Sequence, residues 1–159
     1  MVHLRESPVD TAEAHTLLAE YFGARADIFP GGGYRTVFPD PAAFVPPRGV
    51  FVVLEQEGAG ETAQAVGCGG IRRIDDGDLG MRYELKHLYV KPEGRGKGWG
   101  RMLLDDLEAR ARAFGAAELV LDTHHTLEAA GSLYAHSGFA AIAPYNDNAN
   151  ATRWYGKSL

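Results

Sequence analysis

One segment of the sequence, Tyr83–Gly115, constrains the fold more than any other, because it predicts a strand, a tight turn and a helix in direct succession. The apolar strand residues end at Lys91-Pro92, and proline cannot continue a central strand. A glycine-rich run, Gly94–Gly100, follows. Apolar residues then recur at helical spacing as far as Gly115, which supplies the stop; they are Leu103, Leu104, Leu107, Ala111 and Phe114.

The glycine-rich turn predicts an anion-binding cradle. A glycine turn that opens into a helix presents several backbone N–H groups in one direction, and the helix dipole adds partial positive charge there. Arg95, Lys97 and Arg101 add full charges. An ordinary turn with solvated basic residues is the alternative, but so many glycines at a helix start are costly without a reason. We therefore expect this turn to bind a phosphate or pyrophosphate group.

Two common nucleotide-binding motifs do not fit this turn. A Walker A loop requires Gly, four residues and then Gly-Lys-Ser/Thr, but Gly98 follows Gly96-Lys97, and Lys91 stands in the place of the first glycine. The dinucleotide fingerprint G-x-G-x-x-G fails because, counted from Gly94 or from Gly96, its third glycine falls on another residue type.

The turn does fit the pattern Arg/Gln-x-x-Gly-x-Gly/Ala, present as Arg95–Gly100, and it resembles the acetyl-CoA site of the GCN5-related N-acetyltransferases (GNAT). The similarity continues downstream. Leu119–Thr123 resembles the family's fifth strand, and Ala130–Phe139 resembles its A-x-x-L-Y-x-x-x-G-F helix and strand. Two motifs in the right order and spacing make the resemblance specific over residues 81–140.

The resemblance implies an α/β (α+β) protein with the GNAT acyl-CoA N-acyltransferase fold, in one N-acetyltransferase domain over residues 1–159. The sheet would be mixed and mostly antiparallel, with helices on both faces. The implied activity is transfer of acetyl from acetyl-CoA to a primary amine of a small molecule, an amino acid or another amine, by direct attack in a ternary complex. The alternatives are a non-catalytic acyl-CoA-binding sensor and a protein or peptide N-acetyltransferase.

Length and composition limit the partners of the chain. A chain of 159 residues can bury a substantial core in a single domain. The net charge of −5 argues against nucleic-acid binding and allows a cationic partner such as an amine. Cys68 is the single cysteine, so no internal disulfide is expected. No apolar run approaches the ~18 residues of a membrane span, and we expect a cytoplasmic protein with no membrane partner.

Outside the central segment, the sequence predicts the approximate bounds of further strands and helices. Strands are expected at residues 2–5, 49–55, 64–74 and 117–123, with a hairpin turn at 75–78 and a last hairpin of 139–144 and 152–157. Ser7 is expected to cap a helix that stops near Gly23, and Thr126 to cap one that runs to Ser137. Residues 24–48, broken by Pro and Gly, predict an irregular loop that is either structural or part of the acceptor wall.

Acyl transfer to an amine requires a group that accepts the proton of the amine. An acidic residue stands at this point of the family's fourth strand, so the resemblance implies Glu84 as the general base. The alternative is a solvated carboxylate, or one paired with Lys86 or an arginine. Further base candidates near strand ends are His87, His124, His125 and Asp122. The two adjacent histidines with Asp122 lack a further ligand at suitable spacing, so no metal is expected.

A second group must stabilise or protonate the departing thiolate. Tyr134 matches the tyrosine of the family's L-Y motif, and the resemblance implies that its hydroxyl serves as the general acid. Tyr134 also lies on an apolar helix face with Leu127, Ala130 and Leu133. Both roles are compatible, because a tyrosine can pack its ring and leave its hydroxyl free.

The family places the thioester and pantetheine along the fourth strand, where that strand splays from the fifth. The resemblance therefore implies backbone contacts to the cofactor along the end of the strand and pyrophosphate binding on the glycine turn. Trp99 occupies a slot that is aliphatic in the family and is expected to pack behind the turn. The implied cofactor-binding residues are Leu88, Tyr89, Val90, Arg95, Gly96, Lys97, Gly98, Trp99, Gly100 and Arg101.

The acceptor itself is not specified by the sequence. The last hairpin carries aromatic, amide and carboxylate side chains that suit a small amine or an amino acid: Tyr145, Asn146, Asp147, Trp154 and Tyr155. A solvated hairpin with core aromatics explains the same residues. Cys68 has no evident base beside it and is expected to fill core space. A homodimer is implied only by the resemblance to the family, in which dimers occur.

Overall fold

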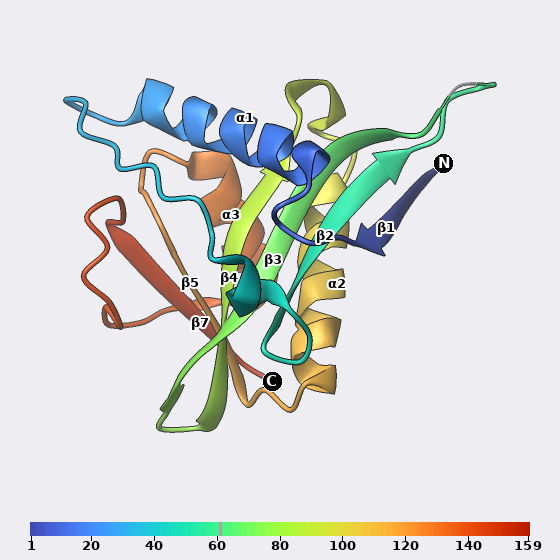
Figure 1. Ribbon diagram of the computed structural model, residues 1–159. Helices are drawn as coiled ribbons and strands as arrows, with labels where there is room; N and C mark the ends of the chain where they lie inside the picture. Colours follow the sequence, from blue (N-terminus) through green and yellow to red (C-terminus); the bar gives the residue numbers. More distant parts are fainter. Residues whose placement is uncertain (61) are drawn as a thin grey trace.

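The computed structural model describes residues 1–60 and 62–159. Within this part of the chain, seven strands form one sheet in the order β1-β2-β3-β4-β5-β7-β6, in which β4 and β5 run parallel and the other neighbours run antiparallel (Figure 1). This mixed, mostly antiparallel sheet confirms the predicted fold class. The elements are β1 (Val2–Glu6), α1 (Ala12–Ile28), β2 (Gly49–Gln56), β3 (Gln64–Gly77), β4 (Gly80–Val90), α2 (Trp99–Ala113), β5 (Glu118–Thr123), α3 (Glu128–His136), β6 (Ala140–Ala141) and β7 (Arg153–Ser158), with short 3₁₀ helices at Pro41–Phe44 and Pro92–Gly94.

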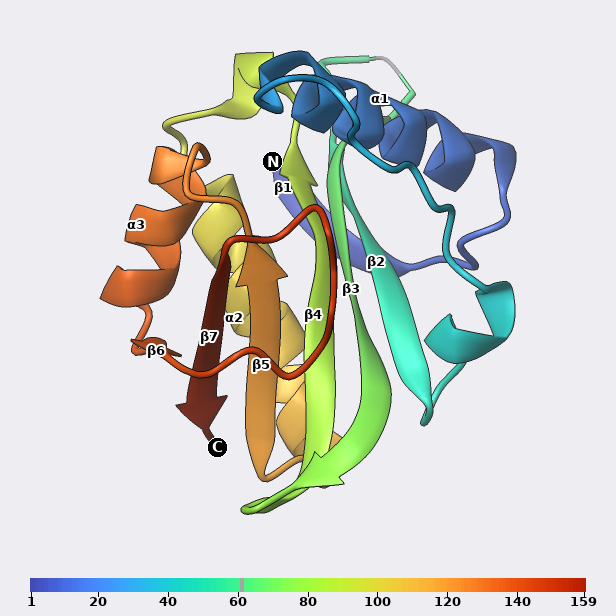
Figure 2. The same cartoon turned by 90° about the vertical axis from the view of Figure 1, so that its left-hand side faces the viewer.

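The sheet separates two apolar cores, because successive residues of a strand point to opposite faces. On one face, Val50, Val52 and Leu54 of β2 pack with residues of α2 and α3. On the other face, Phe51 and Val53 of the same strand pack with α1. The two long helices therefore cover opposite faces of the sheet (Figures 1 and 2).

The carboxyl ends of β4 and β5 separate. The two strands pair over Arg82–Glu84 and Glu118–Val120, and this pairing does not continue to their ends. Both strands point the same way, so the opening between them lies at one edge of the sheet. The backbone of Leu88–Val90 borders this opening on the β5 side. Here the structure confirms the predicted splay.

A β-bulge in β4 shapes the same opening. Cys68 pairs with Tyr89, whereas Gly70 pairs with Lys86, so β4 contains one residue more than β3 over this interval. The bulge includes His87, whose backbone adopts a φ of +59°, which is unusual for a residue other than glycine. The extra residue changes which side chains of β4 face the α1 side of the sheet.

Two loops lie over the α1 side of this opening. The segment between β6 and β7 crosses in front of β5 and β4 before it returns into β7 (Figure 2). The loop that follows α1 reaches the same place. The Arg35 N–H donates to Asn150 Oδ1 at 3.0 Å, and Asn150 Nδ2 donates to the Arg35 carbonyl at 2.7 Å. These reciprocal hydrogen bonds join segments 115 residues apart.

The first helix begins and ends later than predicted. Thr11 caps α1, because its Oγ1 accepts the N–H of Ala14 at 3.1 Å. Ser7, the predicted cap, donates its hydroxyl to the carbonyl of the following residue. Gly23 does not stop the helix, because glycine ends a helix by adopting a positive φ and Gly23 does not adopt one. The helix therefore continues to Ile28, through residues predicted to be irregular.

The third helix also departs from the prediction at its start. The Thr126 hydroxyl lies 2.7 Å from Nδ1 of His124 and does not cap α3, which begins at Glu128 with Leu127 at the cap position. The end is as predicted, with Gly138 at a φ of +87° just beyond the last turn. A local hydrogen bond to a neighbouring histidine therefore replaced the helix cap.

The predicted strands are present, several of them with longer ends, but β6 covers only Ala140–Ala141 of the predicted 139–144. β3 continues to Gly77, so the hairpin turn falls on Asp78-Leu79 and begins later than predicted. None of the helices described within residues 1–60 and 62–159 combines the length and the hydrophobicity of a transmembrane segment.

Candidate active site

The glycine turn before α2 forms an open cradle. Gly96 and Gly98 adopt φ values of +77° and +79°, and a Cβ atom at either position would have no heavy atom within 4 Å. Gly98 is the N-cap of α2 and offers no side chain to its free N–H groups. These amides and the exposed Arg95, Lys97 and Arg101 side chains give the turn the properties of an anion site.

Trp99 supports the cradle from behind, as predicted. Its side chain is 8% exposed, and Lys97 Nζ lies 4.8 Å from the ring centroid. A Cβ atom on Gly94 would lie 2.4 Å from Trp99 Cε3, so only glycine fits between the ring and the chain. The Trp99 indole therefore packs between the turn and the core, and the missing side chain of Gly94 allows the ring to lie close to the backbone.

A cavity of about 930 Å³ extends from this cradle along the end of β4. Four parts of the chain form its walls: the last turns of α1, the end of β4, the cradle and the start of α3. Every residue implied by the resemblance as cofactor-binding, except Lys97, lines this cavity. The cavity therefore joins an anion site to an exposed strand edge, which is the arrangement that a long phosphorylated cofactor requires.

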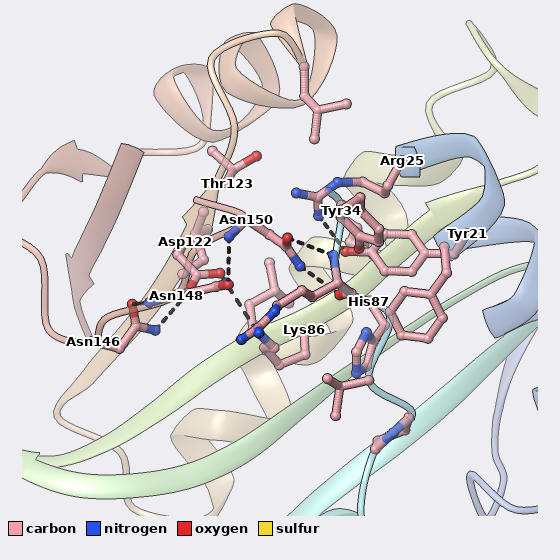
Figure 3. A pocket seen from close by; sticks show the side chains of 18 of the residues that line it. Tyr21, Arg25, Tyr34, Lys86, His87, Asp122, Thr123, Asn146, Asn148 and Asn150 are labelled. Atoms are coloured by element: carbon pink, nitrogen blue, oxygen red, sulfur yellow. Dashed lines mark hydrogen bonds and ion pairs between the residues drawn. The ribbon is translucent and has the colours of Figure 1, made fainter. Parts of the chain in front are cut away.

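A second cavity, of about 660 Å³, lies over the separated ends of β4 and β5 (Figure 3). Its walls come from α1, the loop at residues 34–40, β3, β4, β5, α3 and the loop at residues 146–150. The two cavities share the wall residues Tyr21, Arg25, Leu88, Leu127 and Ala130. They therefore adjoin at the end of β4. We call the first the cofactor cavity and the second the acceptor cavity.

Tyr134 lies at the junction of these cavities. It lines the acceptor cavity, while Ala130, one turn earlier on α3, lines both. Its ring packs against Phe139 and Tyr155, with centroids 5.9 and 6.1 Å away. Burial raises the pKa of Tyr134, so its hydroxyl keeps its proton at neutral pH. The residue therefore combines a core ring with a protonated hydroxyl on the cavity wall.

Glu84 lies beneath the acceptor cavity and is not part of its described wall. Its side chain is 1% exposed, and Oε1 accepts from Arg72 Nη2 at 2.9 Å and from Arg72 Nε at 3.0 Å. The Tyr145 hydroxyl donates to Oε2 at 2.6 Å. Burial, followed by the nearby Glu84 carboxylate, raises the pKa of Tyr145, which therefore remains a donor. Glu84 is thus held on both oxygens, and Arg72 separates it from the cavity.

Asp122 is the carboxylate that reaches the acceptor cavity from β5. Lys86 Nζ lies 3.6 Å from Oδ1, and the amides of Asn146 and Asn148 donate to Oδ2 at 2.7 and 3.1 Å (Figure 3). Burial opposes its charge, but Lys86 and the two amides outweigh this effect and lower the pKa of Asp122. The carboxylate is therefore ionised and fully engaged by its neighbours.

The histidines named as candidate bases occupy different environments. His87 lies in the bulge of β4 with its ring 5.5 Å from that of Phe22, and within the described residues its Nδ1 has no hydrogen-bond partner. Burial, followed by the charge of Lys86, lowers the pKa of His87 to about 3, so its imidazole is neutral. His124 stacks on His125 at 4.4 Å. Across residues 1–60 and 62–159, no group of three or more His, Cys, Asp or Glu residues is arranged to bind a metal.

Cys68 fills core space, as predicted. Its side chain is fully buried and directs Sγ to the carbonyl of His87 at 3.5 Å. Burial raises the pKa of the thiol, which opposes formation of a nucleophilic thiolate.

Sequence reasoning identified only part of the acceptor cavity. Asn146 and Asp147 line it, whereas Trp154 supports it from outside by donating Nε1–H to Asn146 Oδ1 at 2.9 Å. The loop predicted to be either structural or part of the acceptor wall does line the cavity, with Tyr34 and Phe38 among its residues, whereas Tyr21, Arg25 and Arg72 were not identified as site residues. The aromatic content of residues 29–44 was a usable signal for the loop. No local sequence pattern distinguishes Arg25 and Arg72 from ordinary surface arginines.

Comparison with known proteins identifies the class. The Acetyltransferase (GNAT) family matches residues 12–139, and the chain belongs to this family. A protein named IAA acetyltransferase from Azospirillum brasilense is 32% identical over 143 residues, which cover 89% of this chain and 85% of that relative. The protein is therefore a GNAT-family acyltransferase that depends on acetyl-CoA, as the resemblance implied.

Solved structures share the fold at low sequence identity. A GNAT-family acetyltransferase from Staphylococcus aureus Mu50 superimposes with a TM-score of 0.76 and 18% identity, covering 100% of this chain and 99% of that one. A GNAT-family acetyltransferase from Elizabethkingia anophelis with acetyl-CoA bound gives a TM-score of 0.65 and 15% identity, covering 99% and 98%. A NatC complex bound to Gag peptide and CoA gives 0.75 and 16%, covering 99% and 98%. These similarities concern the fold alone.

Proposed function

We propose that this protein is a single-domain N-acetyltransferase over residues 1–159 that transfers acetyl from acetyl-CoA to the primary amine of a small molecule. One observation carries the proposal: the cofactor cavity and the acceptor cavity meet at Leu88 and Ala130, beside the Tyr134 side chain. A thioester at this junction and an amine in the acceptor cavity would be within reach of each other. Holding two reactants in this way removes much of the entropic barrier to their reaction.

The residues of the cofactor cavity fit the parts of acetyl-CoA. The amides of the cradle, with Arg95, Lys97 and Arg101, would hold the pyrophosphate. Pairing of β4 with β5 ends at Glu84, so the backbone of Leu88–Val90 would bind pantetheine and polarise the thioester carbonyl through one amide. These contacts would position the thioester carbonyl, and the amine would bind in the acceptor cavity.

Two side chains are proposed to move protons. The protonated hydroxyl of Tyr134 would donate to the departing sulfur. Glu84 would accept the proton of the amine through water, because Arg72 and Tyr145 hold its carboxylate below the cavity wall. The buried Cys68 thiol is unsuited to carry the acetyl group, which supports direct attack of the amine in a ternary complex.

The acceptor cavity favours a small molecule over a peptide. The hydrogen bonds between Arg35 and Asn150 join the two loops over the acceptor side. An extended peptide would need an open groove at this place. A peptide acceptor nevertheless remains the second candidate, because a structure with the same fold is a NatC complex bound to a peptide.

Calorimetric titration with acetyl-CoA, followed by assay of free thiol release with a panel of primary amines, tests this proposal. We expect binding, and thiol release that depends on a primary amine and is absent with the matching tertiary amine. Release with peptides but with no small amine would replace the small-molecule acceptor by a peptide. Binding without release from any acceptor would favour a non-catalytic sensor, and no binding would refute the proposal.

A further inference from the structure

Arg25 occupies an unusual position between the two cavities. It lies near the end of α1, is partly buried, and lines both the cofactor cavity and the acceptor cavity. Its guanidinium lies 5.7 Å from the ring of Tyr21 and 5.5 Å from the ring of Tyr34, and Nη1 donates to the Tyr21 hydroxyl at 2.8 Å. Figure 3 shows the side chain reaching from α1 into the cavity beside these two tyrosines. The aromatic rings hold the cation in place without neutralising it.

Two other cations of the acceptor-cavity wall, Arg72 and Lys86, are already paired, and the remaining one, Arg35, is exposed to solvent. Arg72 forms its ion pair with Glu84, and Lys86 pairs with Asp122. Arg25 differs, because among residues 1–60 and 62–159 no carboxylate lies within ion-pair distance of it. A guanidinium has five N–H donors, and the structure gives this one a single side-chain acceptor. A partly buried cation with unused donors is costly unless an anion binds to it.

The cofactor does not require this cation for its phosphates. The pyrophosphate has its own site on the cradle, where Arg95, Lys97 and Arg101 supply positive charge. The 3′-phosphate is carried by the ribose, on the far side of the pyrophosphate from the thioester, and the pantetheine arm and the thioester, which would lie near the junction, are uncharged. An anion beside Arg25 would therefore belong to the acceptor.

The position of Arg25 also limits how far this anion lies from the amine. Because Arg25 lines both cavities, it lies at the junction where the amine would meet the thioester. An anionic group that binds Arg25 while the amine attacks must be separated from the amine by only a few bonds. The α-carboxylate of an amino acid satisfies this requirement, and its planar shape matches the donor pattern of a guanidinium.

We propose that the acceptor is a free α-amino acid, whose carboxylate pairs with Arg25 while its α-amine is acetylated. This inference rests on the proposed function. The remaining acceptor cavity receives the side chain, against a wall that includes Phe22, Val37 and Phe38. Its volume of about 660 Å³ accommodates such a molecule. A peptide N-terminus is a poor acceptor in this arrangement, because an amide carbonyl replaces the charged carboxylate.

Matched acceptors test this pairing. Each of several L-amino acids with apolar side chains is assayed beside its amide and its decarboxylated amine, with the wild-type protein and acetyl-CoA. A carboxylate that pairs with an arginine through two hydrogen bonds gains more binding free energy than a neutral group does at the same place. We therefore expect kcat/KM for the amino acid to exceed that for its amide and its decarboxylated amine by about 100-fold. In Arg25→Gln the ratio should fall to about 10-fold or less, while the acetyl-CoA Kd stays unchanged. Arg25→Lys should retain part of the preference.

Arg112→Gln is the matched control, because Arg112 is an exposed arginine on α2 outside both cavities, and it should keep the wild-type ratio. Wild-type protein that acetylates the three acceptors equally, or prefers the amides, overturns the inference but leaves the N-acetyltransferase intact. Loss of acetyl-CoA affinity in Arg25→Gln with an unchanged acid preference also overturns it, and assigns Arg25 to the cofactor. Absence of thiol release with every amine refutes the proposed function and this inference with it.

Discussion

The two cavities of the site are built in different ways. The cofactor cavity takes its anion cradle and its strand edge from Leu88–Arg101, a short continuous segment. The acceptor cavity takes its walls from segments spread between Tyr21 and Asn150, including the Arg35–Asn150 pair, 115 residues apart. The first offers a ligand mainly backbone groups, and the second offers mainly side chains. One half of the site therefore depends on local backbone geometry, whereas the other depends on tertiary packing.

This difference predicts how substitutions divide between binding and turnover. Damage to the cradle should remove acetyl-CoA binding, because no other part of the chain supplies the same amides. Damage at the junction or in the acceptor cavity should leave that binding intact and lower the rate. The following substitutions test the division, from the largest expected effect to the smallest.

Gly98→Asp should abolish detectable acetyl-CoA binding, a loss of more than about 100-fold in affinity, because it adds a Cβ at a φ of +79° and a negative charge in the anion site. Calorimetry measures the effect. Gly60→Asp is the matched control, since Gly60 has a φ of +76° with open space around it and lies outside both cavities. A folded Gly98→Asp variant with wild-type affinity would show that the cradle does not bind the cofactor.

Tyr134→Phe should lower kcat by about 100-fold, the lower end of the usual range for proton transfer by a positioned side chain, and should leave the acetyl-CoA Kd unchanged. The ring remains to pack against Phe139, so stability should be preserved. Tyr155→Phe, in the same core beside Tyr134, is the control and should keep the wild-type rate. An unchanged kcat in Tyr134→Phe removes its proposed role as acid.

Glu84→Gln should lower kcat by about 10-fold, less than for a base in direct contact, because the amide does not accept the proton of the amine. Asp122→Asn makes the same chemical change on the cavity wall and should lower kcat less. A larger effect in Asp122→Asn than in Glu84→Gln would identify Asp122 of β5 as the general base and assign Glu84 a structural role.

Tyr145→Phe should have the smallest effect on the reaction and lower the free energy of unfolding by about 1–3 kcal/mol, because it removes the 2.6 Å hydrogen bond to the buried Glu84 carboxylate. Urea denaturation measures this change, with Tyr155→Phe as the reference. The acetyl-CoA Kd should not change. A loss of cofactor affinity larger than the loss of stability would show that the two halves of the site are coupled through Glu84.

Much of the fold could be predicted from the sequence, and the errors have local physical causes. Apolar runs bounded by turn residues predicted the strands, and the runs of β2 and β5 are buried on both faces of the sheet. The start of α1 was predicted at Ser7 and lies at Thr11, because both residues can cap a helix and only the surrounding structure selects one. Gly23 was predicted to end α1 but takes no positive φ, and the sequence alone does not report the backbone angle.

The sequence by itself determined the geometry of the cradle: a proline that ends a strand, glycines that admit positive φ, and basic residues at a helix start together predict an anion site. Tertiary structure decided the acceptor half. It paired Glu84 with Arg72 and Tyr145 and positioned Asp122 among Lys86 and the loop amides. Within the part of the chain that the structure describes, it left Arg25 without a carboxylate partner at the junction. The physical reason is one of range. Backbone conformation and helix dipoles act over a few residues, whereas ion pairs and cavities arise only when distant segments are packed together.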